Sequence, residues 1–282
     1  MKHSELAAEY DLARVGARPS LRKYLVEMWR RRDFTVSLAR YRIRSENERN
    51  RLGMLWVLLR PIFSAIIYGL VFGLILGSAR PEGFVPFLII GVFSLEFFNS
   101  SMNDGAKSII NSQPLVQSLP FPRMVLPLAK VVQNLFNFMP TLGLMFILTM
   151  LWGARPSWSW LLFIPLVFLF TLFNTGIALI FARLTVHVRD LSQFVPFISR
   201  MIFYTSGVFF YPAHVLKPYP VLAEIYEWHP LNDVLSLARG ILLEAYPIPF
   251  EYWWKLAIVA TATAIVAVVF FWLAEERYGR EN

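Results

Sequence analysis

A stripe of polar side chains runs along one otherwise apolar segment of the chain. Within residues 125–151, Lys130, Gln133, Asn134 and Asn137 recur at positions i, i+3, i+4 and i+7. This spacing places all four on one face of a helix. Amide and ammonium groups at membrane depth bind either neighbouring helices or a polar cargo that passes between them. Interhelical hydrogen bonding is one interpretation, and a path for a polar cargo is the one that the four-residue stripe favours.

Aromatic side chains form a second group that could contact such a cargo. The run FYTSGVFFYP at 203–212 contains Tyr204, Phe209 and Tyr211, and Tyr68 follows Arg60 and Ser64 in an earlier apolar segment. Aromatic rings pack on sugar rings and also on apolar lipid. A path with polar and aromatic sides therefore indicates an amphiphilic sugar-lipid better than an ion. Ordinary packing and anchoring at the membrane interface remain the alternative for each ring.

Further polar residues repeat at helical spacing in other apolar segments. They are Glu96, Asn99 and Asn103 in one segment, and Arg200 four residues before Tyr204 in another. Arg60 and Arg200 lie near segment ends, so their side chains could instead reach the phosphate headgroups of the membrane.

The sequence contains none of the usual motifs of an enzyme of this size. It has no G-x-x-x-x-G-K-[ST], G-x-S-x-G or H-E-x-x-H, and its four histidines are scattered. The first motif cradles the phosphates of ATP, and the last holds a catalytic zinc ion. Asp190 beside Arg189 is more typical of a structural pair than of a catalytic one. We therefore expect a chain that is not an enzyme, with no metal site and no cofactor of its own.

The composition indicates a membrane protein. Of the 282 residues, 56% are hydrophobic and only 16% are charged, with a net charge of +8 and no cysteine. An ordinary soluble domain carries about 25% charged residues to cover its surface. This composition excludes disorder and most soluble enzymes, and the missing cysteines exclude disulfides and thiolate metal sites.

Six segments approach the roughly 20 apolar residues that a membrane-spanning helix needs. We expect spans near 54–77, from Phe84 to about Phe98, and at 125–151, 158–182, 194–212 and 253–273. The second turns polar after Phe98, and Pro196 interrupts the fifth. Both are therefore predicted to pack inside the bundle.

Lysine and arginine are concentrated before the first span, after the second and fourth spans, and in the tail. By the positive-inside rule both termini are cytoplasmic. Because this distribution explains the excess of positive charge and no recognition motif accompanies it, we expect no nucleic-acid partner. The predicted organisation is a cytoplasmic segment at 1–53, a transmembrane domain at 54–275 and a cytoplasmic tail at 276–282.

Two segments outside the spans have helical patterns. In residues 20–33, Leu21, Tyr24, Leu25, Met28 and Trp29 share one face of a basic amphipathic helix. Such a helix lies in the plane of the lipid headgroups or packs on a cytoplasmic partner.

Residues 213–251 are too polar for a span. There Asn232 or Asp233 could cap a short helix over LSLARGILLE. Two short re-entrant helices or a surface-packed hairpin fit this segment. The predicted fold class is thus an all-α membrane protein with six transmembrane helices, an interfacial helix and two short re-entrant helices.

Four ordered runs resemble the ABC-2 type permeases that export polysaccharides, O-antigen and teichoic acid. They are RRDFTVSLARYRIRSENERNRLGMLWVLLRPI, QPLVQSLPFPRMVLPLAKVVQNLFNF, VRDLSQFVPFISRMIFYTSGVFFYP and HPLNDVLSLARGILL. The resemblance covers essentially the whole chain, with His229 where the family usually has asparagine. One departure is the longer, more charged run RIRSENERNRLG at 42–53. This run and ARVGARPSLRKYL are similar to the actinobacterial branch that is associated with export of mycobacterial cell-wall galactan.

The resemblance implies a homodimer in the cytoplasmic membrane with two copies of a separate ABC ATPase, which would bind ATP and Mg. Contacts with the ATPase would fall on two loops, through Ser112, Gln113, Leu115, Phe121, Arg123, His187, Arg189 and Asp190. The short outer helices would form a gate through Tyr226, Trp228, Asn232, Leu235 and Arg239.

The expected cargo is a polyprenyl-diphosphate-linked glycan, with galactan as the favoured glycan. Its diphosphate would meet five arginines at the cytoplasmic entrance, because planar guanidinium groups suit phosphate oxygens. They are Arg40, Arg42, Arg44, Arg60 and Arg200. The glycan would pass the polar stripe and the aromatic residues, and membrane lipids would surround the spans. The alternatives are another lipid-linked glycan, a membrane glycosyltransferase or phosphatase acting on polyprenyl diphosphates, and a flippase that works without ATP.

Overall fold

The computed structural model describes residues 19–48, 51–77, 80–119 and 121–275. Within these ranges the chain forms helices, turns and bends without a strand, so the all-α prediction is confirmed. The predicted tail at 276–282 and the first 18 residues of the predicted N-terminal segment lie outside the described residues.

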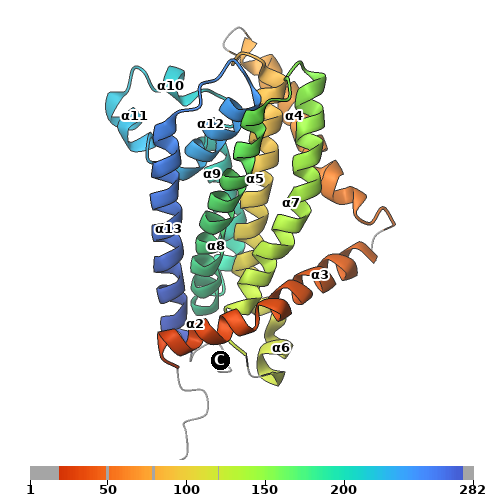
Figure 1. The fold of residues 1–282 in the computed structure, drawn as a ribbon, viewed down its shortest axis with the longest axis vertical. Coiled ribbons are helices and arrows are strands. Elements are labelled where there is room, and N and C mark those ends of the chain that lie inside the picture. The colour runs from red at the N-terminus through yellow and green to blue at the C-terminus, as the bar shows by residue number, and fades with distance from the viewer. Residues whose placement is uncertain (1–18, 49–50, 78–79, 120, 276–282) are drawn as a thin grey trace, which may run out of the picture.

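Five helices of the described chain are long and apolar enough to cross a membrane. They are α4 (Leu55–Ile75), α5 (Phe84–Lys107), α7 (Val125–Leu151), α8 (Phe163–His187, which continues η3, Trp158–Leu162) and α13 (Phe250–Leu273). Figure 1 shows α5, α7, α8 and α13 running along the long axis of the molecule. Five of the six predicted spans are therefore present as helices of sufficient length.

The predicted fifth span differs from expectation. Helix α9 covers Leu191–Thr205, so it starts earlier and ends sooner than the predicted 194–212. Its 15 residues rise about 22 Å at 1.5 Å per residue, which is shorter than the roughly 30 Å of a bilayer core. The predicted interruption at Pro196 is not found, because the helix continues through this residue although a proline removes one helical hydrogen bond. The helix ends just before Gly207, whose φ of 82° turns the chain.

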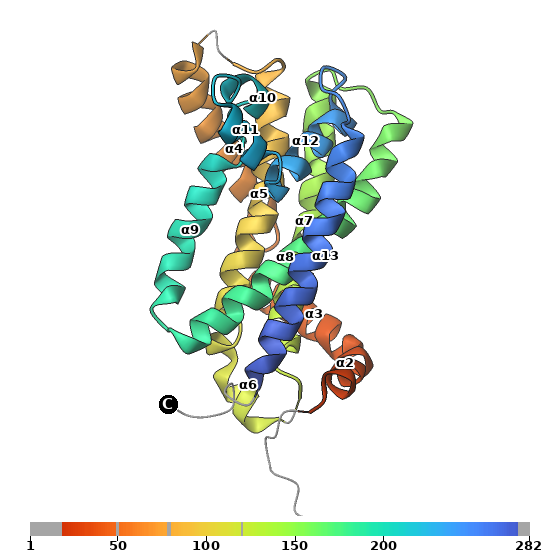
Figure 2. The ribbon, with the colours of Figure 1, turned by 90° about the vertical axis from the view of Figure 1, so that its left-hand side faces the viewer.

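Helix α9 is also less buried than predicted. It buries Val195, Ser199 and Phe203, whereas Phe197 and Met201 on its other side are exposed. The prediction of a helix enclosed by the bundle is therefore wrong for α9 within this chain. Figure 2 shows α9 at the edge of the bundle, running from the end near α6 toward α10 and α11.

Helix α5 lies at the centre of the bundle, and its predicted burial is confirmed. Most of its residues are buried, and it packs against α4, α7, α8 and α9. Gly105 allows the closest of these contacts, because a Cβ there would lie 2.5 Å from the Cβ of Ala178 on α8. The polar half after Phe98 is tolerated because it faces other helices and not lipid.

Three short helices, instead of the predicted two, form one end of the molecule. They are α10 (Pro212–Val215), α11 (Pro220–Tyr226) and α12 (Pro230–Leu242), and we call this end the α10–α12 end. Each begins with a proline, which suits the first helical position because no N–H is needed there. Pro230 sets the start of α12, so His229 caps it by accepting from the Asn232 amide at 3.3 Å, and not Asn232 or Asp233 as predicted.

The opposite end, called the α2–α6 end, carries α2 (Leu21–Arg30), α3 (Arg32–Glu48), η2 (Ile110–Ser112) and α6 (Gln113–Ser118). Only part of the predicted apolar face of α2 is buried. Tyr24 is buried, whereas Leu25 and Trp29 are exposed, Trp29 to 68%. Exposed Trp29 beside arginine is typical of a helix at a membrane interface.

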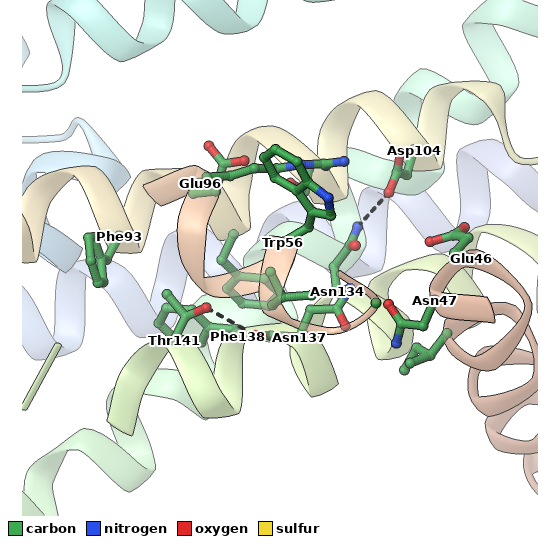
Figure 3. A pocket seen from close by; sticks show the side chains of 16 residues that line it. Glu46, Asn47, Trp56, Phe93, Glu96, Asp104, Asn134, Asn137, Phe138 and Thr141 are labelled. Carbon is green, nitrogen blue, oxygen red and sulfur yellow. Dashed lines mark hydrogen bonds between the residues drawn. The ribbon is translucent and has the colours of Figure 1, made fainter. Parts of the chain in front are cut away.

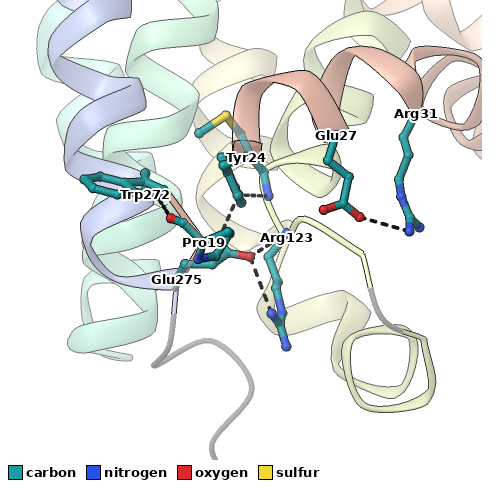
Figure 4. Close-up of polar contacts among 8 residues, drawn as sticks. Pro19, Tyr24, Glu27, Arg31, Arg123, Trp272 and Glu275 are labelled. Atoms are coloured by element: carbon teal, nitrogen blue, oxygen red, sulfur yellow. Dashed lines mark hydrogen bonds and ion pairs between the residues drawn. The ribbon is translucent and has the colours of Figure 1, made fainter. Parts of the chain in front are cut away.

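A buried carboxylate fixes α2 to this end (Figure 4). Glu275, just after α13, accepts from the Tyr24 hydroxyl at 2.8 Å and from the Arg123 backbone amide at 3.0 Å. Trp272 donates to the Pro19 carbonyl oxygen at 2.9 Å. Burial raises the pKa of Glu275, while the bonds from Arg123 and Tyr24 oppose that shift. The first and last described residues thus lie at the same end of the molecule.

Candidate functional site

Three of the four polar stripe residues on α7 bind carboxylates. Lys130 Nζ lies 3.2 Å from Glu46 Oε1, and Gln133 Nε2 donates to Glu46 Oε2 at 2.7 Å. Asn134 Nδ2 donates to Asp104 Oδ2 on α5 at 3.1 Å. The stripe therefore has partners on α3 and α5, and the interhelical interpretation of these residues holds in this structure.

The same region also contains a cavity of about 180 Å³ between α3, α4, α5 and α7 (Figure 3). Asn134 and Asn137 line it, together with Glu46, Glu96 and Asp104. Trp56, Phe93, Phe97 and Phe138 supply aromatic surface, and Arg60 supplies the cation. The stripe thus combines both interpretations, since its bonds join the helices and its asparagines border a polar cavity.

The charges of the cavity decide what it can hold. Three carboxylates, from Glu46, Glu96 and Asp104, face one guanidinium from Arg60 among the lining residues. The acids are partly compensated, since Glu46 pairs with Lys130 and Arg60 is among the lining residues. Carboxylates and carboxamide oxygens accept hydrogen bonds from hydroxyl groups, so the cavity suits a group that carries several hydroxyls.

The predicted aromatic residues lie elsewhere. Tyr68 on α4 packs on Phe203 of α9 and on Phe209, each at 5.2 Å between ring centroids, and Tyr204 stacks on Phe209 at 5.8 Å. Tyr211 contacts Tyr246 near the α10–α12 end at 5.7 Å. None of the four predicted aromatic residues is among the residues that line the cavity. The predicted path is therefore divided into a polar cavity and an aromatic cluster between α4 and α9.

The five predicted diphosphate contacts are also separated. Arg42 donates to Ser112 Oγ at 2.8 Å, and Arg44 pairs with Glu48 at 2.8 Å. Burial lowers the pKa of Arg42, and Glu46 and Asp104 oppose that shift. Arg40 and Arg200 are exposed on different helices, and Arg60 borders the cavity. The structure does not bring these side chains into one cluster.

The predicted ATPase-contact loops both lie at the α2–α6 end (Figure 2). The first contains Ser112, Gln113 and Leu115 in η2 and α6. The second joins α8 to α9 and exposes His187, Arg189 and Asp190. In the first loop, Phe121 is buried against Phe34 at 5.8 Å, and Arg123 pairs with Glu275 at 3.5 Å.

The predicted gate residues divide into a surface pair and a buried group. Tyr226 Oη donates to the Thr205 carbonyl at 2.6 Å, and Trp228 packs on Trp254 at 5.9 Å. Asn232, Leu235 and Arg239 are buried. Arg239 donates to the carbonyls of Gly207 and Val208 at 3.0 and 3.1 Å, so it joins α12 to the turn after α9.

Of the three acids that line the cavity, Glu96 was among the polar residues noted in the sequence, whereas Glu46 and Asp104 were missed. Glu46 binds α7 residues 84 and 87 positions away, and Asp104 lies 30 positions from its partner Asn134. The high proportion of charged residues at 42–53 was the feature of the sequence that could have pointed to Glu46. Among the described residues, no group of three or more His, Cys, Asp or Glu side chains is arranged to hold a metal ion.

Several characterised proteins are similar to this chain. An O-antigen export system permease protein of Myxococcus xanthus is 27% identical over 88% of this chain and 92% of its own length. A Klebsiella pneumoniae O-antigen export permease is 28% identical over 78% of this chain and 83% of its own length. The polysialic acid transport protein KpsM of Escherichia coli is 25% identical over 72% and 79%, respectively. Because the family model described as ABC-2 type transporter matches residues 35–243, the chain belongs to the ABC-2 type transporter family.

Proposed function

We propose that this chain is the membrane permease of an exporter that moves a lipid-linked polysaccharide across the cytoplasmic membrane. The similar proteins named for O-antigen export and polysialic acid transport support this class of cargo. The observation that carries the proposal is the polar cavity beside α7, because carboxylates and asparagines next to Trp56 suit the hydroxyls and apolar face of a sugar. The favoured cargo is a polyprenyl-diphosphate-linked galactan.

In this proposal the glycan and the diphosphate use different surfaces. The acids and asparagines of the cavity accept hydrogen bonds from sugar hydroxyls, so the cavity takes the glycan. The diphosphate meets the exposed arginines Arg40 and Arg200, and also Arg60, which is exposed although it lines the cavity. The aromatic cluster of Tyr68, Tyr204 and Phe209 contacts the polyprenyl chain or the passing sugars.

The proposed assembly is a homodimer with two copies of a separate ATPase bound at the α2–α6 end, which faces the cytoplasm. The exposed outer faces of α4 and α9 support a second copy or lipid beside them, since apolar side chains such as Phe63, Ile67, Phe197 and Met201 are exposed there. Helix α9 and residues 206–211, which lead to α10, together form the sixth crossing of the membrane in this proposal. The α10–α12 end then forms the outer gate.

One purification tests this function against the alternatives. The chain is purified with its co-expressed genomic neighbours, and the preparation is examined for a bound ATPase that carries a Walker motif. We expect such a subunit, with ATP-dependent movement of lipid-linked glycan in reconstituted vesicles. A stable chain that moves the glycan without any ATPase, or that transfers or cleaves the sugar itself, would overturn the proposal.

A further inference from the structure

The charged run at 42–53 departs from the pattern of the family that the chain resembles, and the structure gives part of it a definite place. Its described residues up to Glu48 form the last turns of α3, which packs along α7. Glu46 and Asn47 line the cavity, and Arg42 lies one helical turn before Glu46. We propose that α3 regulates the cavity: it transmits movement of the α6 loop to Glu46, and Glu46 in turn positions the polar stripe of α7. This inference rests on the proposed function.

The connection to the α6 loop is direct. Arg42 Nη2 donates to Ser112 Oγ at 2.8 Å, and Ser112 immediately precedes α6. Phe34, near the start of α3, packs edge-to-face on Phe121, at the other side of α6. Helix α3 therefore contacts the α6 loop on both sides of α6. A displacement of α6 is expected to displace α3 as well.

The connection to the cavity lies on the next turn. A single carboxylate, that of Glu46, binds both Lys130 and Gln133 of α7. These two partners are shielded from solvent, with 16% of the Lys130 side chain and 1% of Gln133 exposed. Glu46 itself is 57% exposed, so if α3 moves away, the partly shielded ammonium of Lys130 and the buried amide of Gln133 lose their shared acceptor. In the proposal the stripe has a second arrangement, in which Lys130 and Gln133 are released from Glu46.

Helices α2 and α3 are joined by the single residue Arg31, whose φ of −96° and ψ of 15° depart from helical geometry. Backbone hydrogen bonds still cross this joint, since the Arg31 amide donates to Glu27 and Met28 and its carbonyl accepts from Thr35. Helix α2 is held by Tyr24, which donates to the buried Glu275 after α13 (Figure 4). With α2 fixed, movement of α3 takes place about Arg31. The region of α3 that moves furthest is its end at Glu46 and Asn47.

Spin-label distances test the movement, and because this chain has no native cysteine, the introduced cysteines are its only labelling sites. Labels are placed at the exposed positions Tyr41→Cys on α3 and Met139→Cys on α7, in the complex with the ATPase subunit. We expect the distance distribution to shift when ATP and vanadate trap the ATPase. We also expect Arg42→Gln, which removes the guanidinium that donates to Ser112, to abolish most of that shift, although the complex still forms.

Function is measured on the same complex. Glu46→Gln keeps the shape of the side chain and removes its charge, and it is expected to lower glycan export per ATP hydrolysed about tenfold, within the 5–150-fold range of typical coupling between sites. The matched control is Glu48→Gln, because Glu48 is on the same helix and pairs only locally with Arg44 among the contacts described. Export and ATP hydrolysis should be unchanged in the control. The exchange Glu46→Lys with Lys130→Glu should recover part of the export that Glu46→Lys loses.

The outcomes separate this inference from the proposed function. If the wild-type chain binds no ATPase, the proposed function fails. If the ATPase binds but the α3–α7 distance does not respond to trapping, or responds equally in Arg42→Gln, the regulation by α3 is wrong. If Glu46→Gln only reduces the amount of assembled complex, with export per ATP unchanged, Glu46 has a structural role alone.

Discussion

The guanidinium of Arg239 lies over the ring of Phe87, with Cζ 3.3 Å from the ring centroid. Arg239 is on α12 and only 2% exposed, while Phe87 is fully buried near the start of α5. A cation over an aromatic ring is attracted by the negative face of the ring. The pair therefore fixes α12 to the central helix of the bundle, and Arg239 belongs to the framework that holds the α10–α12 end.

Replacing Arg239 should destabilise the protein. Arg239→Met keeps much of the apolar volume and leaves the carbonyls of Gly207 and Val208 without their donors. Each buried, unpaired carbonyl costs about 1–3 kcal/mol, so we expect a loss of about 2–6 kcal/mol. The melting temperature in detergent measures this loss of stability. The control is Arg155→Met, because Arg155 is exposed at the same end of the molecule. Equal melting temperatures for the two variants would show that Arg239 does not stabilise the α10–α12 end.

The positions of Arg239 and Glu46 show why the sequence predicts the fold better than the site. Five spans are found by length and hydropathy because both are properties of a contiguous segment. The partners of Glu46 on α7 and of Arg239 in the turn after α9 are far along the chain, so no local pattern reveals them. The stripe at Lys130–Asn137 predicts a polar face on α7, but it cannot tell which acids face it. The length of α9 was overestimated because the apolar run continues past Gly207, where the backbone turns.

The contact between α5 and α8 gives a prediction about packing. Gly105→Ala places a Cβ 2.5 Å from the Cβ of Ala178 and 2.8 Å from its Cα, so the helices must separate. Overpacking of this kind costs about 1–3 kcal/mol. The control is Gly143→Ala on α7, where nothing lies within 4 Å and alanine favours the helix. We expect the first variant to melt earlier and the second to melt at or above the wild type, and the reverse order would refute the argument.

Arg60 and Arg200 test the contact with the diphosphate. Arg60 borders the cavity and Arg200 is exposed on α9, so their removal leaves no described hydrogen bond broken within the chain. We expect Arg60→Ala and Arg200→Ala together to slow export about tenfold or more, because charged hydrogen bonds to phosphate are strong. Assembly with the ATPase should stay intact. Normal export by the double variant would remove both arginines from the diphosphate site.

Asp233 on α12 is a buried acid near an existing ion pair. It is 0% exposed, and both its carboxylate oxygens are without a hydrogen-bond partner among the described residues. Lys255 on α13 instead pairs with Glu227 at 3.1 Å. Burial raises the pKa of Asp233 from 3.8 to about 8, with Lys255 opposing and Glu227 adding to the shift. The carboxyl group is therefore protonated in the folded protein at neutral pH.

This raised pKa predicts that stability falls as the pH rises. Between the unfolded value of 3.8 and the folded value of about 8, the folded state holds a proton that the unfolded state has released. The free energy of unfolding then decreases by up to about 1.4 kcal/mol per pH unit and becomes level above pH 8. Asp233→Asn cannot ionise and should lose this dependence, so its advantage over the wild type should grow from pH 5 to pH 8. Melting temperatures across that range measure it, with the exposed Asp33→Asn as the control. Parallel curves for the wild type and Asp233→Asn would show that Asp233 does not titrate in this range.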